Sequence, residues 1–151
     1  MPAHVEQKSQ KTRVVQPDPV RKKPLVKHHI LLAEDDAEMR SMLALALTQE
    51  GYSVIECRNG EELSLCLRES CFQASERVDL VISDIRMPGM SGLGVLATHG
   101  QKPRCPPVIL MTAFGDAQTR REAGQMGAVA FFEKPFGLDD LIRRVREITP
   151  P

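Results

Sequence analysis

The chain has 151 residues, with 20 Lys and Arg side chains against 20 Asp and Glu, so its formal net charge is zero. Its length fits one domain with a modest appendage. With 42% hydrophobic and 26% charged residues, the composition excludes a collagen-like or wholly disordered chain. No apolar run approaches the roughly 18 residues of a membrane span, and no apolar signal-peptide core opens the sequence.

The neutral total hides two segments of opposite charge. Residues 1–28 carry a net charge of +5, and residues 29–151 carry −5. The first segment has four prolines and few large apolar side chains, so it buries too little surface to offset its ordering entropy. We expect a flexible basic tail over 1–28 and one domain over 29–149. The tail lacks aromatics between its basic residues, which argues against a specific nucleic-acid surface.

The four cysteines do not indicate a metal site. They form no C-x-x-C pair, and no histidine lies at zinc-finger spacing. In a chain without an export signal we expect them to stay reduced, in the cytoplasm.

From residue 29 onward, short apolar runs alternate with helical patterns. We predict five strands, at 30–33, 52–57, 78–83, 107–111 and 128–132. A helix is predicted after each strand: at 37–50, at about 59–70, a short one after Gly92, at 116–126 and at the end of the chain. The last helix places its apolar side chains on one stripe, formed by Leu138, Leu141, Ile142, Val145 and Ile148. The first helix is expected to bury Met39, Met42, Leu43, Ala46 and Leu47, and Gly51 is expected to end it.

This alternation indicates an α/β fold with a five-stranded parallel sheet. Parallel strands need crossover connections, so helices are expected on both faces. Right-handed crossovers then give a doubly wound sandwich. In such folds ligands bind beyond the carboxyl ends of the strands, so the functional side chains are expected among the residues that follow each strand.

Carboxylates, a hydroxyl and a lysine follow the predicted strands: Glu34, Asp35 and Asp36 after the first, Asp84 after the third, Thr112 after the fourth and Lys134 after the fifth. Two like charges about 4 Å apart repel by on the order of 4 kcal/mol at an effective dielectric near 20, so clustered carboxylates need a cation. Oxygen ligands suit Mg²⁺, and a carboxylate beside it can attack phosphorus. A lysine and a hydroxyl can then hold phosphoryl oxygens.

Four segments together resemble the receiver domain of two-component response regulators, over roughly residues 28–149. They are residues 31–40, residues 84–92, the pair Thr112-Ala113 and the pair Lys134-Pro135. The resemblance is to stand-alone receivers of the chemotaxis-regulator type. It implies a flavodoxin-like sheet of strand order 2-1-3-4-5.

By this resemblance Asp84 accepts a phosphoryl group from a phosphohistidine, on a sensor histidine kinase or a histidine phosphotransfer protein. Glu34, Asp35, Asp84 and the backbone carbonyl of Arg86 would hold Mg²⁺, the one cofactor expected. A register shifted by one residue would assign the acidic pair to Asp35 and Asp36 instead.

The resemblance also implies the switch residues. Thr112 and Lys134 would contact the phosphoryl oxygens, and Phe131 would move together with Thr112. The Lys134–Pro135 peptide bond would be cis. Arg86 and Phe114 would flank the phosphoryl group and influence the access of water.

We expect the output surface to comprise the helix at 116–126, the strand at 128–132 and the last helix. Its exposed candidates for partner contact are Arg120, Arg121, Arg143, Arg144 and Arg146. Only three residues follow the last helix, so we expect no attached DNA-binding domain, no catalytic activity of its own and output by contact with a downstream protein. Whether phosphorylation causes dimerisation is left open.

Three other functions compete with this interpretation. A nucleotide- or flavin-binding protein would need a glycine-rich first loop, and an acidic loop stands there. A phosphatase of the haloacid-dehalogenase type would carry a second aspartate two positions after the nucleophile, where this chain has Arg86. A receiver-like scaffold that acts without phosphorylation remains the third alternative.

Overall fold

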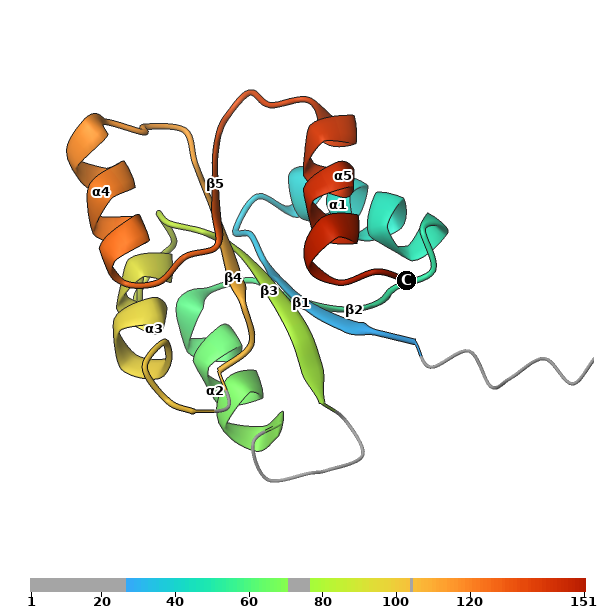
Figure 1. Cartoon of the computed structure of the whole chain (residues 1–151), viewed down its shortest axis with the longest axis horizontal. Coiled ribbons are helices and arrows are strands. Elements are labelled where there is room, and N and C mark those ends of the chain that lie inside the picture. Colours follow the sequence, from blue (N-terminus) through green and yellow to red (C-terminus); the bar gives the residue numbers. More distant parts are fainter. Residues whose placement is uncertain (1–26, 71–76, 104) are drawn as a thin grey trace, which may run out of the picture.

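The computed structural model describes residues 27–70, 77–103 and 105–151, which form a five-stranded parallel sheet flanked by helices (Figure 1). The strands lie in the order β2-β1-β3-β4-β5, so the predicted doubly wound topology of order 2-1-3-4-5 is confirmed. The strands are β1 (His29–Ala33), β2 (Ser53–Cys57), β3 (Val78–Asp84), β4 (Val108–Thr112) and β5 (Ala130–Glu133). Of the predicted basic tail, residues 1–26 lie outside the described residues.

One helix follows each strand, as the alternating pattern predicts. The helices are α1 (Ala37–Gln49), α2 (Gly60–Ser70), α3 (Gly92–His99), α4 (Ala117–Gln125) and α5 (Leu138–Ile148). Helices α1 and α5 cover one face of the sheet, and α2, α3 and α4 lie on the other (Figure 1). None of the helices in the described ranges has the length and apolarity needed to cross a membrane.

The sheet divides the buried side chains into two cores because successive residues of a strand point to opposite faces. In β1, Ile30 and Leu32 pack with α1 and α5, whereas Leu31 and Ala33 pack with α2 and α3. All four side chains are fully buried. Burial on both faces explains why the strands appear in the sequence as continuous apolar runs.

The first helix corrects one prediction. Leu43 and Leu47 are fully buried, but Met42 has 52% of its surface exposed. Helical side chains advance by about 100° per residue, so a helix that faces the sheet with Leu43 turns Met42 toward its flank. Gly51 follows the helix with a φ of +100°, a left-handed conformation that glycine adopts readily, and this confirms the predicted helix end.

Strands β3, β4 and β5 each extend one residue beyond the predicted end, and in β3 and β4 this places two candidate site residues inside the sheet. Asp84 is the last residue of β3 and pairs with Met111 of β4, while Thr112 is the last residue of β4 and pairs with Glu133 of β5. Their backbones are therefore fixed by the sheet. The Lys134–Pro135 bond is cis, as predicted.

Candidate functional site

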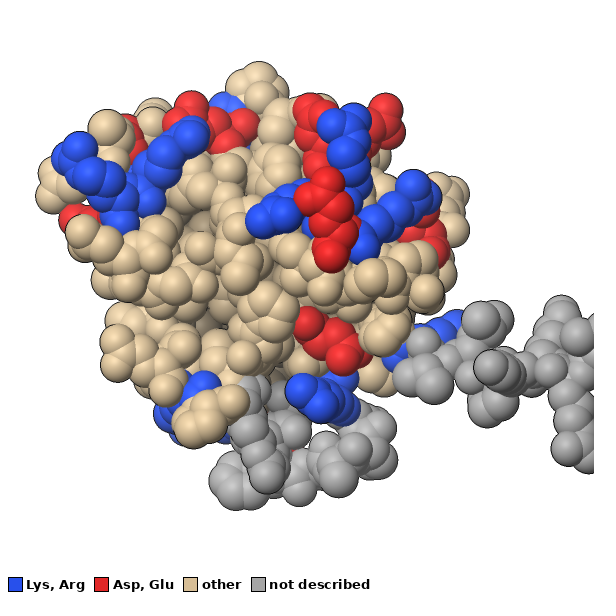
Figure 2. All heavy atoms as spheres, viewed as in Figure 1, with Lys and Arg blue, Asp and Glu red and all other residues tan. Residues whose placement is uncertain are grey.

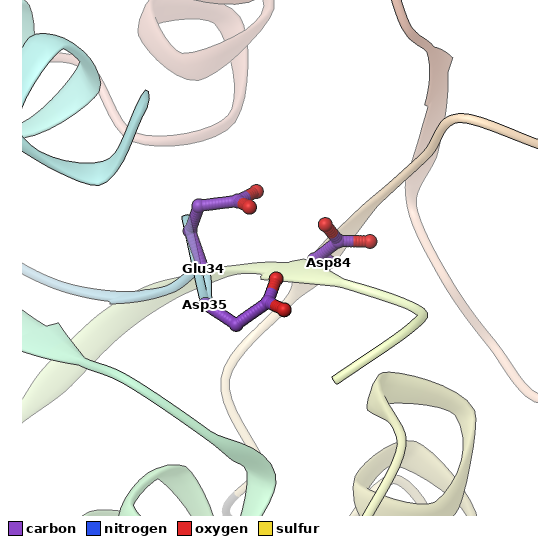
Figure 3. A group of neighbouring side chains, drawn as sticks. All are labelled: Glu34, Asp35 and Asp84. Atoms are coloured by element: carbon purple, nitrogen blue, oxygen red, sulfur yellow. The ribbon is translucent and has the colours of Figure 1, made fainter. Parts of the chain in front are cut away.

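Three carboxylates gather at the carboxyl edge of the sheet. Glu34 and Asp35 follow β1, Asp84 ends β3, and one oxygen of each lies within 4.8 Å of the others. Figure 3 shows the three carboxylate groups facing a common space. Glu34 and Asp84 are buried, and Asp35 is exposed. The group is thus held by the fold on one side and open to solvent on the side of Asp35.

The pairing of neighbouring parallel strands explains why these residues meet. Ala33 of β1 pairs with Ser83 of β3, so the residues that come next, Glu34 and Asp84, lie at the same level of the sheet. The residues are 50 positions apart in the sequence. Their proximity is set by the register of the sheet.

The backbone of Glu34 is fixed from two sides. Its N–H donates a hydrogen bond of 3.1 Å to the carbonyl of Cys57, at the end of β2. Its carbonyl accepts a hydrogen bond of 2.8 Å from Nη1 of Arg40, on α1. The Arg40 side chain also lies 3.5 Å from Glu56 Oε1. Strand β2 and helix α1 therefore hold the start of the acidic loop in place.

The Asp36 side chain caps helix α1, unlike the side chains of Glu34 and Asp35. It is the N-cap of α1, and its carboxylate accepts a hydrogen bond of 2.9 Å from the N–H of Met39. Its own N–H donates to Glu34 Oε1 at 3.2 Å. The structure thus brings Glu34 and Asp35 to Asp84, and it places the Asp36 carboxylate at the helix end.

Lys134 contacts two of the three carboxylates. Its Nζ lies 2.7 Å from Glu34 Oε2 and 2.7 Å from Asp84 Oδ2. Lys134 directly follows β5, and its backbone N–H donates a hydrogen bond of 2.7 Å to the carbonyl of Thr112. The β4–β5 pairing therefore delivers the ammonium group to the carboxylate cluster.

Burial and charge shift two pKa values at this site. Burial raises the pKa of Glu34 to about 7, helped by the charge of Asp84, although the hydrogen bond from Lys134 acts in the opposite direction. Burial alone would lower the pKa of Lys134, but its hydrogen bonds to Asp84 and Glu34 outweigh burial and raise that pKa. At neutral pH the lysine is thus charged, and Glu34 is near its midpoint.

The donor set fits a hard divalent cation. Three carboxylates within 4.8 Å of one another offer oxygen ligands without sulfur or imidazole, which is the set that Mg²⁺ prefers. A bound cation would also ionise Glu34 fully, because a nearby positive charge lowers the pKa of a carboxyl group.

Arg86 and Phe114 flank Asp84. The N–H of Arg86 donates a hydrogen bond of 3.1 Å to Asp84 Oδ1, so the Arg86 backbone lies beside the carboxylate. The guanidinium carbon of Arg86 lies 4.6 Å from the ring centroid of Phe114, in cation–π geometry. This stack joins the segment after β3 to the segment after β4, and both side chains are exposed.

Thr112 and Phe131 lie on the side of the site toward α4. Thr112 is buried, and its Oγ1 accepts a hydrogen bond of 3.1 Å from the N–H of Phe114. Phe131 pairs with Leu110 in the sheet and is half-buried against the core under α2, α3 and α4. The guanidinium of Arg120 lies 5.2 Å from the Phe131 ring centroid. The backbone hydrogen bond from Lys134 to the Thr112 carbonyl thus links these two residues, whereas Phe131 lies within β5, three residues before Lys134.

A comparison with known protein families identifies the family of this chain. The response regulator receiver domain family matches residues 30–146. The chain belongs to this family. Receiver domains are signalling domains of two-component systems, where they act in phosphorylation-based signalling, and they generally bind Mg²⁺ at an acidic pocket.

Curated relatives differ in how much of their length the receiver occupies. The transcriptional regulatory protein GlrR of Escherichia coli (strain K12) is 38% identical over 117 residues, which are 78% of this chain and 25% of that protein. Sporulation initiation phosphotransferase F of Bacillus subtilis (strain 168) is 30% identical over 83% of this chain and 97% of its own length. The chain therefore spans about a quarter of GlrR but nearly all of the sporulation protein.

Solved receiver structures share the fold. A response regulator receiver protein from Pseudomonas putida is 28% identical, with a TM-score of 0.72 over 80% of this chain and 97% of that chain. The chemotaxis protein CheY4 of Vibrio cholerae is 22% identical, with a TM-score of 0.70 over 81% of this chain and 98% of that chain. The second likeness shows the fold alone.

Sequence reasoning missed two features of this receiver. The Cys57 carbonyl that holds Glu34 is a backbone group and carries no sequence signal. The Arg86–Phe114 stack was also missed, although both residues were expected to flank the phosphoryl group. A signal for the stack was available, because each residue lies two positions beyond a strand-end site residue.

Proposed function

We propose that Asp84 is the phosphoacceptor of this receiver and that Mg²⁺ is required for the transfer. The observation that carries the proposal is the position of Lys134, whose Nζ lies 2.7 Å from Asp84 Oδ2 and 2.7 Å from Glu34 Oε2. Carboxylate oxygens of these two residues and of Asp35 lie within 4.8 Å of one another. One buried aspartate is thus held beside two further acidic groups and one cation. This is the set that phosphoryl transfer to a carboxylate needs.

In the proposed transfer, an oxygen of the Asp84 carboxylate forms a bond to phosphorus as the phosphorus–nitrogen bond of a phosphohistidine breaks. The imidazole leaving group takes up a proton. Bound Mg²⁺, held by Glu34, Asp35, Asp84 and the Arg86 carbonyl, would neutralise charge on the phosphoryl oxygens. The Lys134 ammonium would move from the Asp84 carboxylate to a phosphoryl oxygen, and the Thr112 hydroxyl would donate to another.

We propose a sensor histidine kinase or a histidine phosphotransfer protein as the donor. The phosphoryl group would come from a phosphohistidine, because its imidazole is a better leaving group for this transfer than the oxygen of a phosphate ester. The exposure of Asp35 and of the Arg86–Phe114 stack supports access by a protein partner from the carboxyl edge of the sheet.

The output surface would be the face formed by α4, β5 and α5. Arg120 of α4 forms an ion pair of 2.9 Å with Glu133, the residue before Lys134, and also lies over Phe131. A displacement of Lys134 or Phe131 would therefore disturb Arg120. Figure 2 shows basic side chains over α4 and mixed basic and acidic side chains over α5. We propose that a downstream protein contacts this face.

The proposal is tested by incubation with acetyl phosphate, a small phosphoryl donor, followed by intact mass measurement. With Mg²⁺ the wild-type chain should gain about 80 Da, the mass of one phosphoryl group, and should gain none in excess EDTA. Asp84→Asn should gain none under either condition. Asp35→Asn should slow the gain because it removes one proposed metal ligand.

Asp36→Asn is the matched control for Asp35→Asn. It removes the same charge one position later, and asparagine caps helices as well as aspartate does. Phosphorylation of Asp36→Asn at the wild-type rate supports the assignment of Glu34 and Asp35 as the acidic pair. Equal loss in both variants contradicts it. If the wild-type chain gains no mass, the result favours a receiver-like scaffold that acts without phosphorylation. If it hydrolyses a phosphate ester with sustained turnover, the result favours a phosphatase.

A further inference from the structure

Two cysteine side chains meet beside the acidic loop. Cys57 Sγ lies 4.0 Å from Cys66 Sγ, and the two residues are not joined by a disulfide. Cys57 is the last residue of β2 and is fully buried, whereas Cys66 lies within α2 and is half-buried. The bond length of a disulfide is about 2.05 Å, so a shift of about 2 Å shared between strand and helix would join them.

This cysteine pair is linked to the site by one hydrogen bond. The carbonyl of Cys57 accepts the N–H of Glu34 at 3.1 Å, and the Glu34 carboxylate contacts Lys134. Cys57 is enclosed by the core, so a displacement of its backbone is transmitted to Glu34. When a group that orients a metal ligand is disturbed, metal affinity or activity typically falls by about 10–100-fold.

We infer that Cys57 and Cys66 form a reversible disulfide under oxidising conditions and that this cross-link slows phosphoryl acceptance at the neighbouring pocket. The cross-link stands on the sulfur geometry alone. Its effect on acceptance rests on the function proposed above.

The chemistry balances with a peroxide as the oxidant. The Cys66 sulfur is the more accessible one, and it attacks one oxygen of hydrogen peroxide to give a sulfenic acid and one water. The Cys57 sulfur then attacks the Cys66 sulfur, forms the S–S bond and releases the second water. Two thiols and one peroxide thus give one disulfide and two waters, and a dithiol reductant reverses the reaction.

The sequence makes the cross-link easy to locate. Tryptic cleavage after Arg58 separates the two cysteines, so Cys57 lies in peptide 41–58 and Cys66 in peptide 59–68. Cys71 and Cys105 lie in two further peptides, 69–77 and 105–120. After mild peroxide treatment and alkylation of the remaining thiols, peptides 41–58 and 59–68 should appear as one species that reductant separates.

Two variants sharpen the experiment. Cys66→Ser should abolish the linked species, and Cys105→Ser should leave it unchanged. Alkylation of Cys57 after peroxide, or linkage of peptide 59–68 to peptide 69–77, would overturn the inference.

The effect on the site is measured as the initial rate of phosphorylation by acetyl phosphate with Mg²⁺. The cross-linked wild type should be slower than the reduced wild type by on the order of tenfold, whereas peroxide-treated Cys66→Ser should keep its rate. Equal rates in cross-linked and reduced wild type would overturn the coupling. If the reduced chain accepts no phosphoryl group, the proposed function fails, and the peptide result still decides the cross-link.

Discussion

The Lys134 Nζ donates a hydrogen bond of 2.7 Å to Asp84 Oδ2 and a second one of 2.7 Å to Glu34 Oε2. The ammonium group offsets part of the negative charge that the fold concentrates there. It comes from the end of β5, whereas the two carboxylates come from β1 and β3. One side chain therefore ties together three strand ends of the sheet.

Removal of this ammonium should destabilise the fold. Lys134→Ala leaves the buried carboxylates of Glu34 and Asp84 without their cation, and we expect the free energy of unfolding at pH 7 to fall by about 2 kcal/mol. Addition of Mg²⁺ should restore much of this loss. Denaturant unfolding with and without Mg²⁺ measures both effects. Lys102→Ala, at an exposed lysine, is the control, and equal stability of the two variants would contradict the role of Lys134.

The raised pKa of Glu34 predicts a pH-dependent stability. The Glu34 carboxyl group keeps its proton up to about pH 7 in the folded chain but only up to about pH 4.5 in the unfolded chain. Protonation of Glu34 therefore stabilises the fold fully below pH 4.5, and this stabilisation is lost as the pH rises through 7. The contribution is about 3 kcal/mol, since each pKa unit corresponds to about 1.4 kcal/mol. It should be absent in Glu34→Gln. The groups facing Glu34 are Asp84, Asp35 and Lys134, so unfolding is compared between wild type and Glu34→Gln without Mg²⁺ across this range.

A loss of stability that is the same in wild type and Glu34→Gln would contradict this assignment. Affinity for Mg²⁺ should change in the opposite direction, because the ionised carboxylate is the ligand. It should therefore increase as the pH rises through 7 in wild type.

The candidate site could be predicted largely because its side chains lie at strand ends. The apolar runs of parallel strands are recognisable in the sequence, and the chemistry of Asp84 and Lys134 stands out against them. The topology then brings strand ends together without any further information. The backbone contact between Cys57 and Glu34 could not be predicted this way, since it depends on the register of β2.

Met42 shows a different limit. Its spacing is typical of the buried stripe of α1, but the direction in which a helix faces the sheet is set by packing, and here Leu43 and Leu47 take the central positions. The sequence also left two registers open for the acidic pair, Glu34 with Asp35 or Asp35 with Asp36. The structure places the Asp36 carboxylate at the N-cap of α1, where it accepts a hydrogen bond from the N–H of Met39.

Two glycine substitutions should change stability in opposite directions. A Cβ at Gly60 would lie 1.8 Å from the backbone oxygen of Met90, so Gly60→Ala forces the start of α2 away from the loop after β3. We expect a loss of about 2–4 kcal/mol. Gly124, inside α4, has open space around its Cβ position, and Gly124→Ala should add about 0.5–1 kcal/mol. Thermal unfolding of both variants tests this, and a destabilised Gly124→Ala would contradict the geometry.

His99 should make the fold sensitive to acid. Its ring lies buried between α2 and α3, with Nε2 2.8 Å from Ser64 Oγ, and burial lowers its pKa below 6.5, with Lys102 and Arg68 adding to the shift. This contribution to stability is complete above pH 6.5 and is lost as the pH falls, because the unfolded chain binds the proton more tightly.

The matched variant for this prediction is His99→Gln, which keeps a hydrogen-bonding group near Ser64 but does not titrate. Glu34 contributes with the opposite sign in the same range, so both measurements are made in the Glu34→Gln background. Removal of His99 should then flatten the acid side of the stability curve. An unchanged slope would assign the acid sensitivity to another group.

The identity of the phosphoacceptor is tested most directly by chemical mapping. Borohydride reduces an acyl phosphate to an alcohol, so phosphorylated aspartate becomes homoserine, while unmodified carboxylates are unaffected. Tryptic peptide 78–86 contains both Asp79 and Asp84, and Asp79 therefore serves as an internal control. After treatment with acetyl phosphate and Mg²⁺, homoserine should replace Asp84 and Asp79 should remain intact. Homoserine at Asp35, Asp36 or Asp79 with Asp84 unmodified would contradict the assignment.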